Sequence, residues 1–391
     1  MTVKEGDFLD IYMDNSATTK VYDEVADEMF LYLKTHYANP SSVHRMGLEV
    51  EKKLKGARKR MANLIGANEK EIVFTSGGTE SDNMAIRGVV KANKRAGKHI
   101  ITTSIEHPAV LNTVKELEEE GYEVTYLKPD ENGVVSFDSF KSSLREDTVL
   151  AAIMHVNNET GSVQPIEKIG KYLSRKKGSK TYFFVDAVQS FGKIDFKPSK
   201  YGIDLMSVSS HKIHGPKGAG ILYIKEGTKI RPMITGGGQE MGIRSGTENI
   251  PGIMGFVMAA ERAVDNIKGN VEKISRLKDM LRFEIEKNID DIKVNSPEDG
   301  ACHVLNVSFL GVRGEVLLHS LEQDGVYVST GSACSSKKKG SHVLLEMGLS
   351  PKELDGAIRF SLSGMNDESQ ILAGAKMVQK HVEEYRKIVK R

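Results

Sequence analysis

The sequence is poor in cysteine, in net charge and in long apolar runs, and each shortage excludes a class of protein. Two cysteines, Cys302 and Cys334, among 391 residues cannot build a disulfide framework and favour a reducing compartment. A formal net charge of +2 without a large basic block argues against nucleic-acid binding. No apolar run approaches the roughly 20 residues of a membrane span, and residues 1–10 lack a hydrophobic signal core. We expect a cytoplasmic protein that binds neither nucleic acid nor membrane.

What the chain does contain is a regular alternation of two patterns. Its 39% hydrophobic and 28% charged residues are ordinary for a globular protein. Short apolar runs typical of strands alternate with segments of helical periodicity. The strands are predicted near residues 71–75, 99–103, 123–127, 149–154, 182–185, 204–208 and 219–224. Such alternation predicts an α/β fold in which helices flank a mainly parallel sheet.

The pattern changes in the last third of the chain. Two long helical stretches from about residue 250 lead to further strands near 303–309, 326–328 and 357–362. This arrangement predicts a smaller α+β domain. We place the large domain at residues 15–260 and the small one at 1–14 and 261–391, so that the short N-terminal strand joins the second domain. In mainly parallel sheets like the one predicted for the large domain, ligands bind beyond the carboxyl ends of the strands.

The stretch Ser207-Val208-Ser209-Ser210-His211-Lys212 joins two of the predicted strands. A lysine between buried strands is costly unless it is exposed, paired or used covalently. Hydroxyls, an imidazole and a desolvated amine at a strand end would suit a phosphorylated aldehyde held as a Schiff base. A solvated Lys212 in a surface turn explains this stretch by itself equally well.

Asp186 ends an aromatic-rich strand that is predicted to be buried. An unpaired buried carboxylate is expensive, and a pyridinium nitrogen is one partner that would resolve the cost. A carboxylate that caps the next segment is the alternative.

Three other polar tracts follow predicted strands. Ser76-Gly77-Gly78-Thr79 opens a helix, where converging N–H groups and a hydroxyl can bind an anion, although glycine pairs are common in turns. His107 begins the next helix and could stack on a flat ring or move protons, or it could simply cap that helix. Asn157-Asn158 offers two amides to a ligand, and asparagine-rich turns also occur without one.

Two loops carry the remaining candidates. The glycine-rich tract 236–249, which contains Thr247, is either a solvated linker or a phosphate-binding segment that reaches a partner subunit. Cys334 lies in a small, polar tract beside Lys337-Lys338-Lys339, and neighbouring cations raise the thiolate fraction of a cysteine. Cys302 leads into an apolar strand and is predicted to be an inert core thiol.

Taken together, these tracts resemble the cysteine desulfurases of the NifS/IscS family, which are fold-type I pyridoxal-phosphate enzymes. The resemblance covers nearly the whole chain. It rests on seven tracts in order: Asp14-Asn15-Ser16-Ala17-Thr18-Thr19, Thr75-Ser76-Gly77-Gly78-Thr79-Glu80-Ser81, Met154-His155-Val156-Asn157-Asn158-Glu159, Val185-Asp186-Ala187-Val188-Gln189-Ser190, His211-Lys212, Arg244-Ser245-Gly246-Thr247 and Gly331-Ser332-Ala333-Cys334.

The resemblance implies a role for each candidate. Lys212 would hold pyridoxal phosphate as a Schiff base and act as the base, and Cys334 would be the sulfur-accepting nucleophile. Asp186 would pair with the ring nitrogen, Gln189 with the ring hydroxyl, and His107 would stack on the ring. The phosphate would be bound by Gly78, Thr79, Ser209, His211 and, from the second subunit of a homodimer, Thr247. Asn158 and Arg359 would contact the substrate carboxylate.

The implied reaction removes sulfur from L-cysteine, which gives L-alanine and a persulfide on Cys334. The sulfur would pass to an iron–sulfur scaffold or to a sulfur carrier for tRNA thiolation. No metal site is expected. A selenocysteine lyase, an aminotransferase and a cofactor-free binding module are the alternatives, and an aminotransferase has no use for a loop thiol. His214 stands where relatives often have tyrosine, which we expect to be tolerated.

Overall fold

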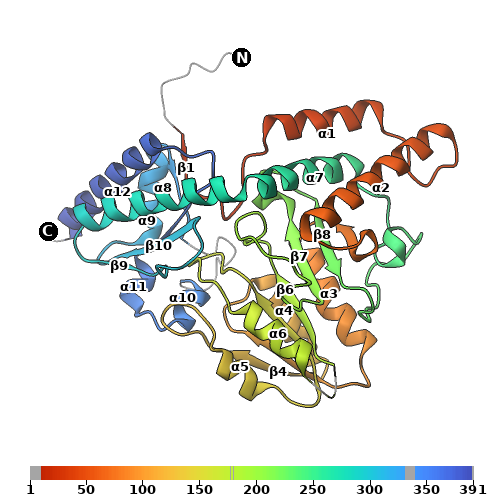
Figure 1. Ribbon diagram of the computed structural model, residues 1–391. Coiled ribbons are helices and arrows are strands. Elements are labelled where there is room, and N and C mark those ends of the chain that lie inside the picture. The colour runs from red at the N-terminus through yellow and green to blue at the C-terminus, as the bar shows by residue number, and fades with distance from the viewer. Residues whose placement is uncertain (1–9, 177, 179, 331–339, 390–391) are drawn as a thin grey trace.

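The computed structural model describes residues 10–176, 178, 180–330 and 340–389 (Figure 1). The principal helices are α1 Asp23–Thr35, α2 Arg45–Ile65, α3 Gly78–Ala92, α4 Pro108–Glu119, α5 Phe137–Ser143, α6 Ile166–Arg175, α7 Ile250–Asp265, α8 Ile267–Asn288, α9 Gly314–Gln323, α10 His342–Glu346, α11 Pro351–Asp355 and α12 Glu368–Val389. The strands are β1 Ile11–Tyr12, β2 Ile72–Thr75, β3 His99–Thr103, β4 Glu123–Leu127, β5 Thr148–Met154, β6 Tyr182–Asp186, β7 Leu205–Ser209, β8 Gly220–Ile224, β9 Ile292–Val294, β10 Val304–Phe309, β11 Val326–Tyr327 and β12 Ala357–Ser361. Short 3₁₀ turns include η2 Ser210–Lys212 and η3 Glu240–Gly242.

The largest sheet has seven strands in the order β2-β8-β7-β6-β5-β3-β4. All neighbouring strands are parallel except β8, which runs antiparallel to both β2 and β7. The seven strands predicted between residues 71 and 224 are therefore confirmed, as is the mainly parallel sheet.

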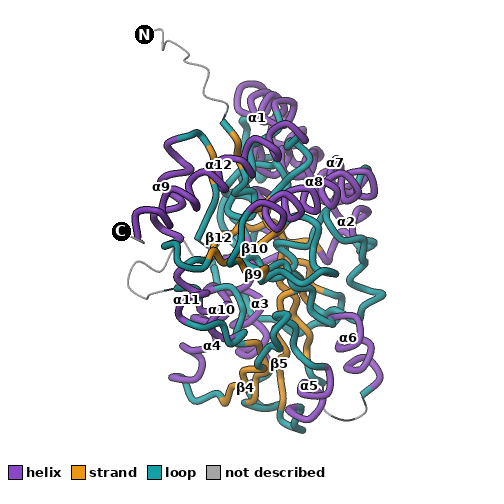
Figure 2. The backbone as a smooth tube through the Cα atoms, turned by 90° about the vertical axis from the view of Figure 1, so that its left-hand side faces the viewer, coloured by secondary structure: helices purple, strands orange, loops and turns teal. Residues whose placement is uncertain are grey.

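Successive side chains of each strand point to opposite faces of this sheet, and both sets are apolar. Helices therefore cover both faces. In β6, Phe183 and Val185 pack in one core with α2, α6 and α7. Tyr182 and Phe184 point the other way and pack with α3 and α4. Figure 2 shows α3 and α4 on one side of the strands and α5 and α6 on the other. Burial on both faces accounts for the continuous apolar runs of a parallel sheet.

A second, smaller core lies around the antiparallel sheet β12-β10-β9. It contains Ile11 and Met13 from the N-terminal end, together with residues from α8, α9 and α12. β1 pairs in parallel with β11, which brings the start of the described chain to this part of the molecule. The first core draws on residues up to Val264. Apart from Ile11 and Met13, the second core draws on residues from Val271 onward, so the junction of α7 and α8 connects the two cores.

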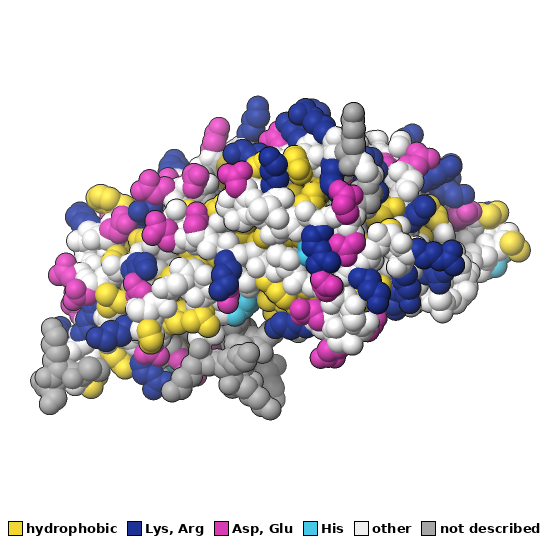
Figure 3. Space-filling model, turned by 90° about the horizontal axis from the view of Figure 1, so that it is seen from below, with side chains coloured by type: hydrophobic (Ala, Val, Ile, Leu, Met, Phe, Trp, Pro, Cys, Tyr) yellow, Lys and Arg dark blue, Asp and Glu magenta, His cyan; other side chains and the backbone are white. Residues whose placement is uncertain are grey.

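One face of the molecule carries charged side chains of both signs (Figure 3). On the face shown in Figure 3, acidic and basic side chains are interspersed. Within the described ranges, no helix is long and apolar enough to cross a membrane.

Candidate active site

The site begins where β6 and β7 end side by side. The two strands are parallel, and Asp186 pairs in register with Ser207. Immediately after Ser209, the chain tightens into the turn η2, which carries His211 and Lys212. Because both strands present their carboxyl ends at the same edge, the predicted acid and the predicted lysine meet beyond the sheet.

Lys212 is held by the carbonyls of the N-terminal segment. Its Nζ donates to the oxygens of Ser16 at 2.6 Å and Ala17 at 2.7 Å. Desolvation lowers the pKa of Lys212 to about 8, and the nearby Arg359 cation acts in the same direction. An amine with a lowered pKa has more of its neutral, nucleophilic form near neutral pH. The solvated alternative for this lysine is therefore not what the structure shows.

Asp186 is buried, and one donor to its carboxylate lies among the described residues. Its Oδ1 accepts a hydrogen bond from the N–H of Val188 at 2.9 Å. Burial raises the pKa of Asp186, while His107 and Lys212 act against that rise, so these charged groups lie close enough to interact. A buried carboxyl with one oxygen lacking a hydrogen-bond donor suits a cationic ring N–H.

Four of the predicted phosphate ligands line one cavity of about 370 Å³. They are Gly78, Thr79, Ser209 and His211. Gly78 opens α3, and no side chain caps this helix, so its first N–H groups face the cavity as an anion site. A Cβ at Gly78 would come within 2.9 Å of Val188, so the close packing requires glycine there.

His107 and Gln189 frame the same site. His107 is the N-cap of α4, where its Nδ1 accepts from the N–H of Ala109 at 3.1 Å. Desolvation lowers the pKa of His107, and the charge of Asp186 acts in the opposite direction. Gln189 is buried and donates through Nε2 to the Ser16 carbonyl at 3.0 Å.

Arg359 belongs to the smaller core but reaches this site. It lies on β12 and is only 3% exposed. Its Nη2 pairs with Asp14 at 2.7 Å, and its Nη1 donates to the backbone oxygen of Asn158 at 3.0 Å. Its Nε is buried and has no hydrogen-bond partner within the described part of the chain. The two predicted carboxylate ligands are therefore neighbours, and the guanidinium retains a free donor.

Two predicted residues are not placed with the others. Cys334 and the basic tract Lys337–Lys339 lie outside the described residues. Thr247 is exposed and lines an adjacent pocket of about 150 Å³ with Arg244 and Asn249, separate from the phosphate cavity of its own chain. The described residues on either side of the segment that contains Cys334 nevertheless contact the site.

On one side of that segment, the backbone N–H of Arg359 donates to the oxygen of Ser329 at 2.6 Å. On the other, the hydroxyl of Ser341 bonds to Glu159, and Nε2 of His342 lies 3.2 Å from the oxygen of Glu106. The described residues that flank 331–339 therefore lie beside the candidate site.

Sequence reasoning assigned no role to several groups that shape this site. Asp14 and the backbone oxygens of Ser16 and Ala17 lie in a tract that supports the family resemblance, but the sequence gives none of them an individual role. His303 contacts Gln189 from the small sheet, with Nε2 3.2 Å from Oε1. The prediction that Cys302 is a core thiol is confirmed, since it is only 8% exposed and burial raises its pKa.

Comparison with known proteins defines the class of protein to which this site belongs. The model of the aminotransferase class-V family matches residues 11–373. The chain therefore belongs to that family, and the relatives below assign it to the NifS/IscS group within it, as the sequence tracts predicted.

Two relatives and two solved structures illustrate the similarity. A cysteine desulfurase IscS of Clostridium botulinum is 44% identical over 365 residues, which are 92% of this chain and 91% of that protein. A cysteine desulfurase of Trichormus azollae is 47% identical over 363 residues, 92% and 90% of the two chains. The solved structure of a NifS-like protein matches with a TM-score of 0.91 and 39% identity, and covers 96% of this chain and 100% of that one. The structure of SspA in complex with cysteine matches with a TM-score of 0.80 and 36% identity over 90% and 98%.

Proposed function

We propose that the protein is a pyridoxal-phosphate-dependent cysteine desulfurase. It would convert L-cysteine to L-alanine and carry the sulfur as a persulfide on Cys334 to an iron–sulfur scaffold or a sulfur-carrier protein. The observation that carries the proposal is the position of Lys212, whose lowered pKa of about 8 and strand-end location accompany Asp186 and an anion-binding cavity. The names of the relatives and the cysteine bound to SspA support the choice of substrate.

The residues present fit the cofactor. The uncapped start of α3 with Ser209 and His211 would bind its phosphate, Asp186 its ring nitrogen, Gln189 its ring hydroxyl, and His107 would lie against its ring. When bound, pyridoxal phosphate supplies an electron sink for charge that develops at the substrate Cα.

The residues of the chain itself would then handle the substrate. The guanidinium of Arg359, with its free Nε, would bind the substrate carboxylate beside Asn158. Lys212 would act as the base. With its amine free, it would remove the proton from the Cα of the substrate. The carbonyls of Ser16 and Ala17 hold the Nζ of Lys212 in place before that step.

The sulfur transfer falls to Cys334. Its thiolate would attack the substrate sulfur, so that an S–S bond forms as the C–S bond breaks, and the carbon product leaves as alanine after protonation. The anchors at Ser329 and Ser341 support the delivery of this thiol to the site, because they fix both ends of its segment. The same segment could present the persulfide to an acceptor.

We also propose a cytoplasmic homodimer. Thr247 of the partner subunit would complete each phosphate site, because within its own chain Thr247 is exposed and lines a separate pocket. The low cysteine content favours a reducing compartment.

The deciding experiment supplies L-cysteine and a reductant and measures alanine and sulfide. Wild type should form both, Lys212→Ala should form neither, and Cys334→Ser should lose sulfide release. Equal sulfide from wild type and Cys334→Ser would contradict the role of Cys334. Amino-group transfer to a keto acid that survives in Cys334→Ser would instead favour an aminotransferase, and a faster reaction with selenocysteine would favour a lyase.

A further inference from the structure

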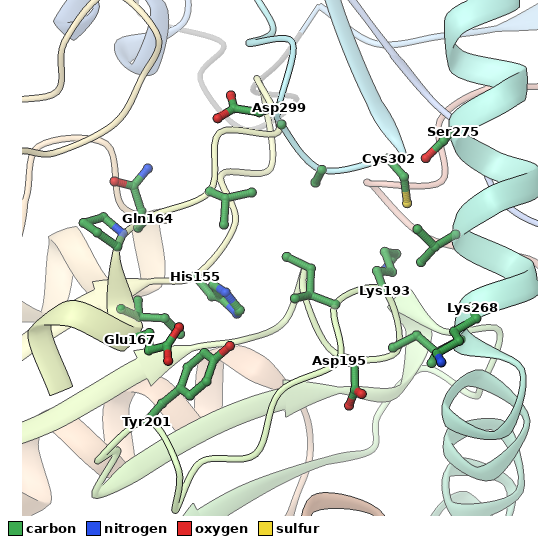
Figure 4. A pocket seen from close by; sticks show the side chains of 18 of the residues that line it. His155, Gln164, Glu167, Lys193, Asp195, Tyr201, Lys268, Ser275, Asp299 and Cys302 are labelled. Carbon is green, nitrogen blue, oxygen red and sulfur yellow. The ribbon is translucent and has the colours of Figure 1, made fainter. Parts of the chain in front are cut away.

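A cavity of the described chain lies apart from the site described above. It has a volume of about 790 Å³ and lies where the two cores meet. Its walls come from the segment 163–168, from the turn after β6, from the start of α8 and from residues 299–302. In Figure 4, His155 and Cys302 face each other across the open space. None of the proposed cofactor or substrate ligands lines it.

Lys193 brings an uncompensated cation to this cavity. It forms no ion pair with any carboxylate in the described part of the chain, and its Nζ donates only to the backbone oxygen of Lys212 at 3.1 Å. Desolvation lowers its pKa to about 8, and the nearby Cys302 thiol acts against that shift. Lys193 is half-buried, and an ammonium with three donors and one acceptor among the described residues can take an anion as a further partner.

His155 provides a second, independent signal. It is only 3% exposed, and its Nδ1 is buried without a hydrogen-bond partner. The ring makes an edge-on contact with Phe196, at 4.7 Å between centroids. Desolvation lowers the pKa of His155 to about 3, so the ring is neutral and can donate one N–H. The ring also lines the cavity, so it is a candidate contact for a ligand there.

The rim of the cavity has a different character from its interior. The charged side chains of the rim are all exposed, and acids slightly outnumber bases: Glu167, Asp195, Glu272 and Asp299 against Lys168 and Lys268. Between rim and interior, the wall is apolar: Val163, Pro165, Ile166, Ile194, Ile267 and Val271. An interior cation, an apolar wall and an acidic rim together fit a small zwitterion with an aliphatic side chain. A dianion would be repelled by the rim.

We propose that this cleft binds a free aliphatic amino acid, with its carboxylate on Lys193 and His155 and its ammonium toward the acidic rim. The site is distinct from the proposed catalytic one. It is nevertheless connected to it, because Lys193 also supports the carbonyl of Lys212. Occupancy would therefore act on the backbone that carries the proposed cofactor lysine.

The test is calorimetric titration of the holoenzyme with L-leucine. Prior treatment with borohydride fixes the cofactor irreversibly to its lysine, so that the catalytic site can no longer exchange amines. We expect one L-leucine per chain, bound at least tenfold more tightly than acetate or inorganic phosphate. Lys193→Gln should weaken binding at least tenfold, whereas Lys268→Gln, which changes an exposed lysine of the rim, should alter it less than twofold.

Ser275 offers a second variant that leaves the interior donors intact. It lines the cleft from α8 and is only half-buried, so Ser275→Phe should fill the space and abolish binding without changing the melting temperature. Absence of L-leucine binding, or equal binding by wild type and either Lys193→Gln or Ser275→Phe, would overturn the proposal. Binding of acetate or phosphate as tight as that of L-leucine would overturn the assignment to an amino acid. The absorbance of the bound cofactor reports separately on the proposed function.

Discussion

The side-chain amide of Gln189 fixes which nitrogen of the His303 imidazole carries the proton. The backbone oxygen of Ser16 can only accept, so the Gln189 amide nitrogen must face it, at 3.0 Å. The amide oxygen therefore faces Nε2 of His303 at 3.2 Å, and this nitrogen must carry the proton. Since Lys212 donates to the same Ser16 oxygen, a continuous hydrogen-bonded chain links the small sheet to the proposed cofactor lysine.

We predict that His303→Ala lowers the stability of the protein and loosens the cofactor. The variant leaves a buried amide oxygen without a donor, which costs about 1–3 kcal/mol. His303→Asn should recover part of the loss, since its amide can donate to Gln189. Urea denaturation and the rate of cofactor dissociation would measure both effects, and His319→Ala serves as an exposed control. Equal behaviour of His303→Ala and His303→Asn would contradict this positioning role.

The segment that carries Thr247 is held by a buried ion pair. Arg58 binds both oxygens of Glu240 at 2.6 and 2.7 Å, and the two side chains are only 13% and 2% exposed. Glu240→Ala would leave the guanidinium of Arg58 without its carboxylate partner. It would also remove the acceptor of the Phe74 N–H. We expect a loss of about 3–5 kcal/mol in the free energy of unfolding.

The matched control for that prediction is Glu49→Ala. Its partner Arg45 lies 3.8 Å away, and both side chains are largely exposed, at 58% and 90%. Exposed pairs contribute at most about 1 kcal/mol. If chemical denaturation showed similar losses for the two variants, the segment would not depend on the Arg58–Glu240 pair.

Glu106 makes stability depend on pH. Burial raises its pKa from 4.5 to about 8, although Thr103 and the N–H of Met154 both donate to Oε1 at 2.8 Å. The unfolded chain loses this proton near pH 4.5, whereas the native state keeps it until about pH 8. The native state thus binds more protons across that window, so stability falls as the pH rises through it.

Replacement by a neutral isostere should remove this dependence. The Glu106→Gln variant should match wild type near pH 4.5 and gain relative stability up to pH 8, at about 1.4 kcal/mol per pH unit. Denaturant midpoints at several pH values would show the divergence. Glu119→Gln changes an exposed position of α4, and its stability should depend on pH in the same way as that of wild type. Parallel curves for Glu106→Gln would mean that Glu106 is ionised in the native state.

Most of the fold could be predicted from sequence because its signals are local. β5 and β6 are continuous apolar runs between turn residues, and the strand positions follow directly. The three residues of β9 and the five of α10 are too short to leave a periodic pattern. The contact of His303 with Gln189 spans 114 residues, and the cleft at Lys193 exists only once the two cores meet. No local pattern contains such information.

A glycine on a neighbouring strand controls the phosphate cavity indirectly. A Cβ at Gly220 would lie 2.7 Å from both the Cα of Gly77 and the oxygen of Val208, which are backbone atoms that cannot rotate away. Gly220→Ala must therefore push the Gly77 turn, where α3 begins, or pull β8 from β7. We expect at least tenfold weaker cofactor binding, with an overpacking cost of about 1–3 kcal/mol in stability. Gly56→Ala is the control, because its Cβ meets nothing within 4 Å and should stabilise α2 by up to about 1 kcal/mol. Cofactor titration and urea denaturation separate the two effects, and unchanged affinity in Gly220→Ala would show that the strands move rather than the turn.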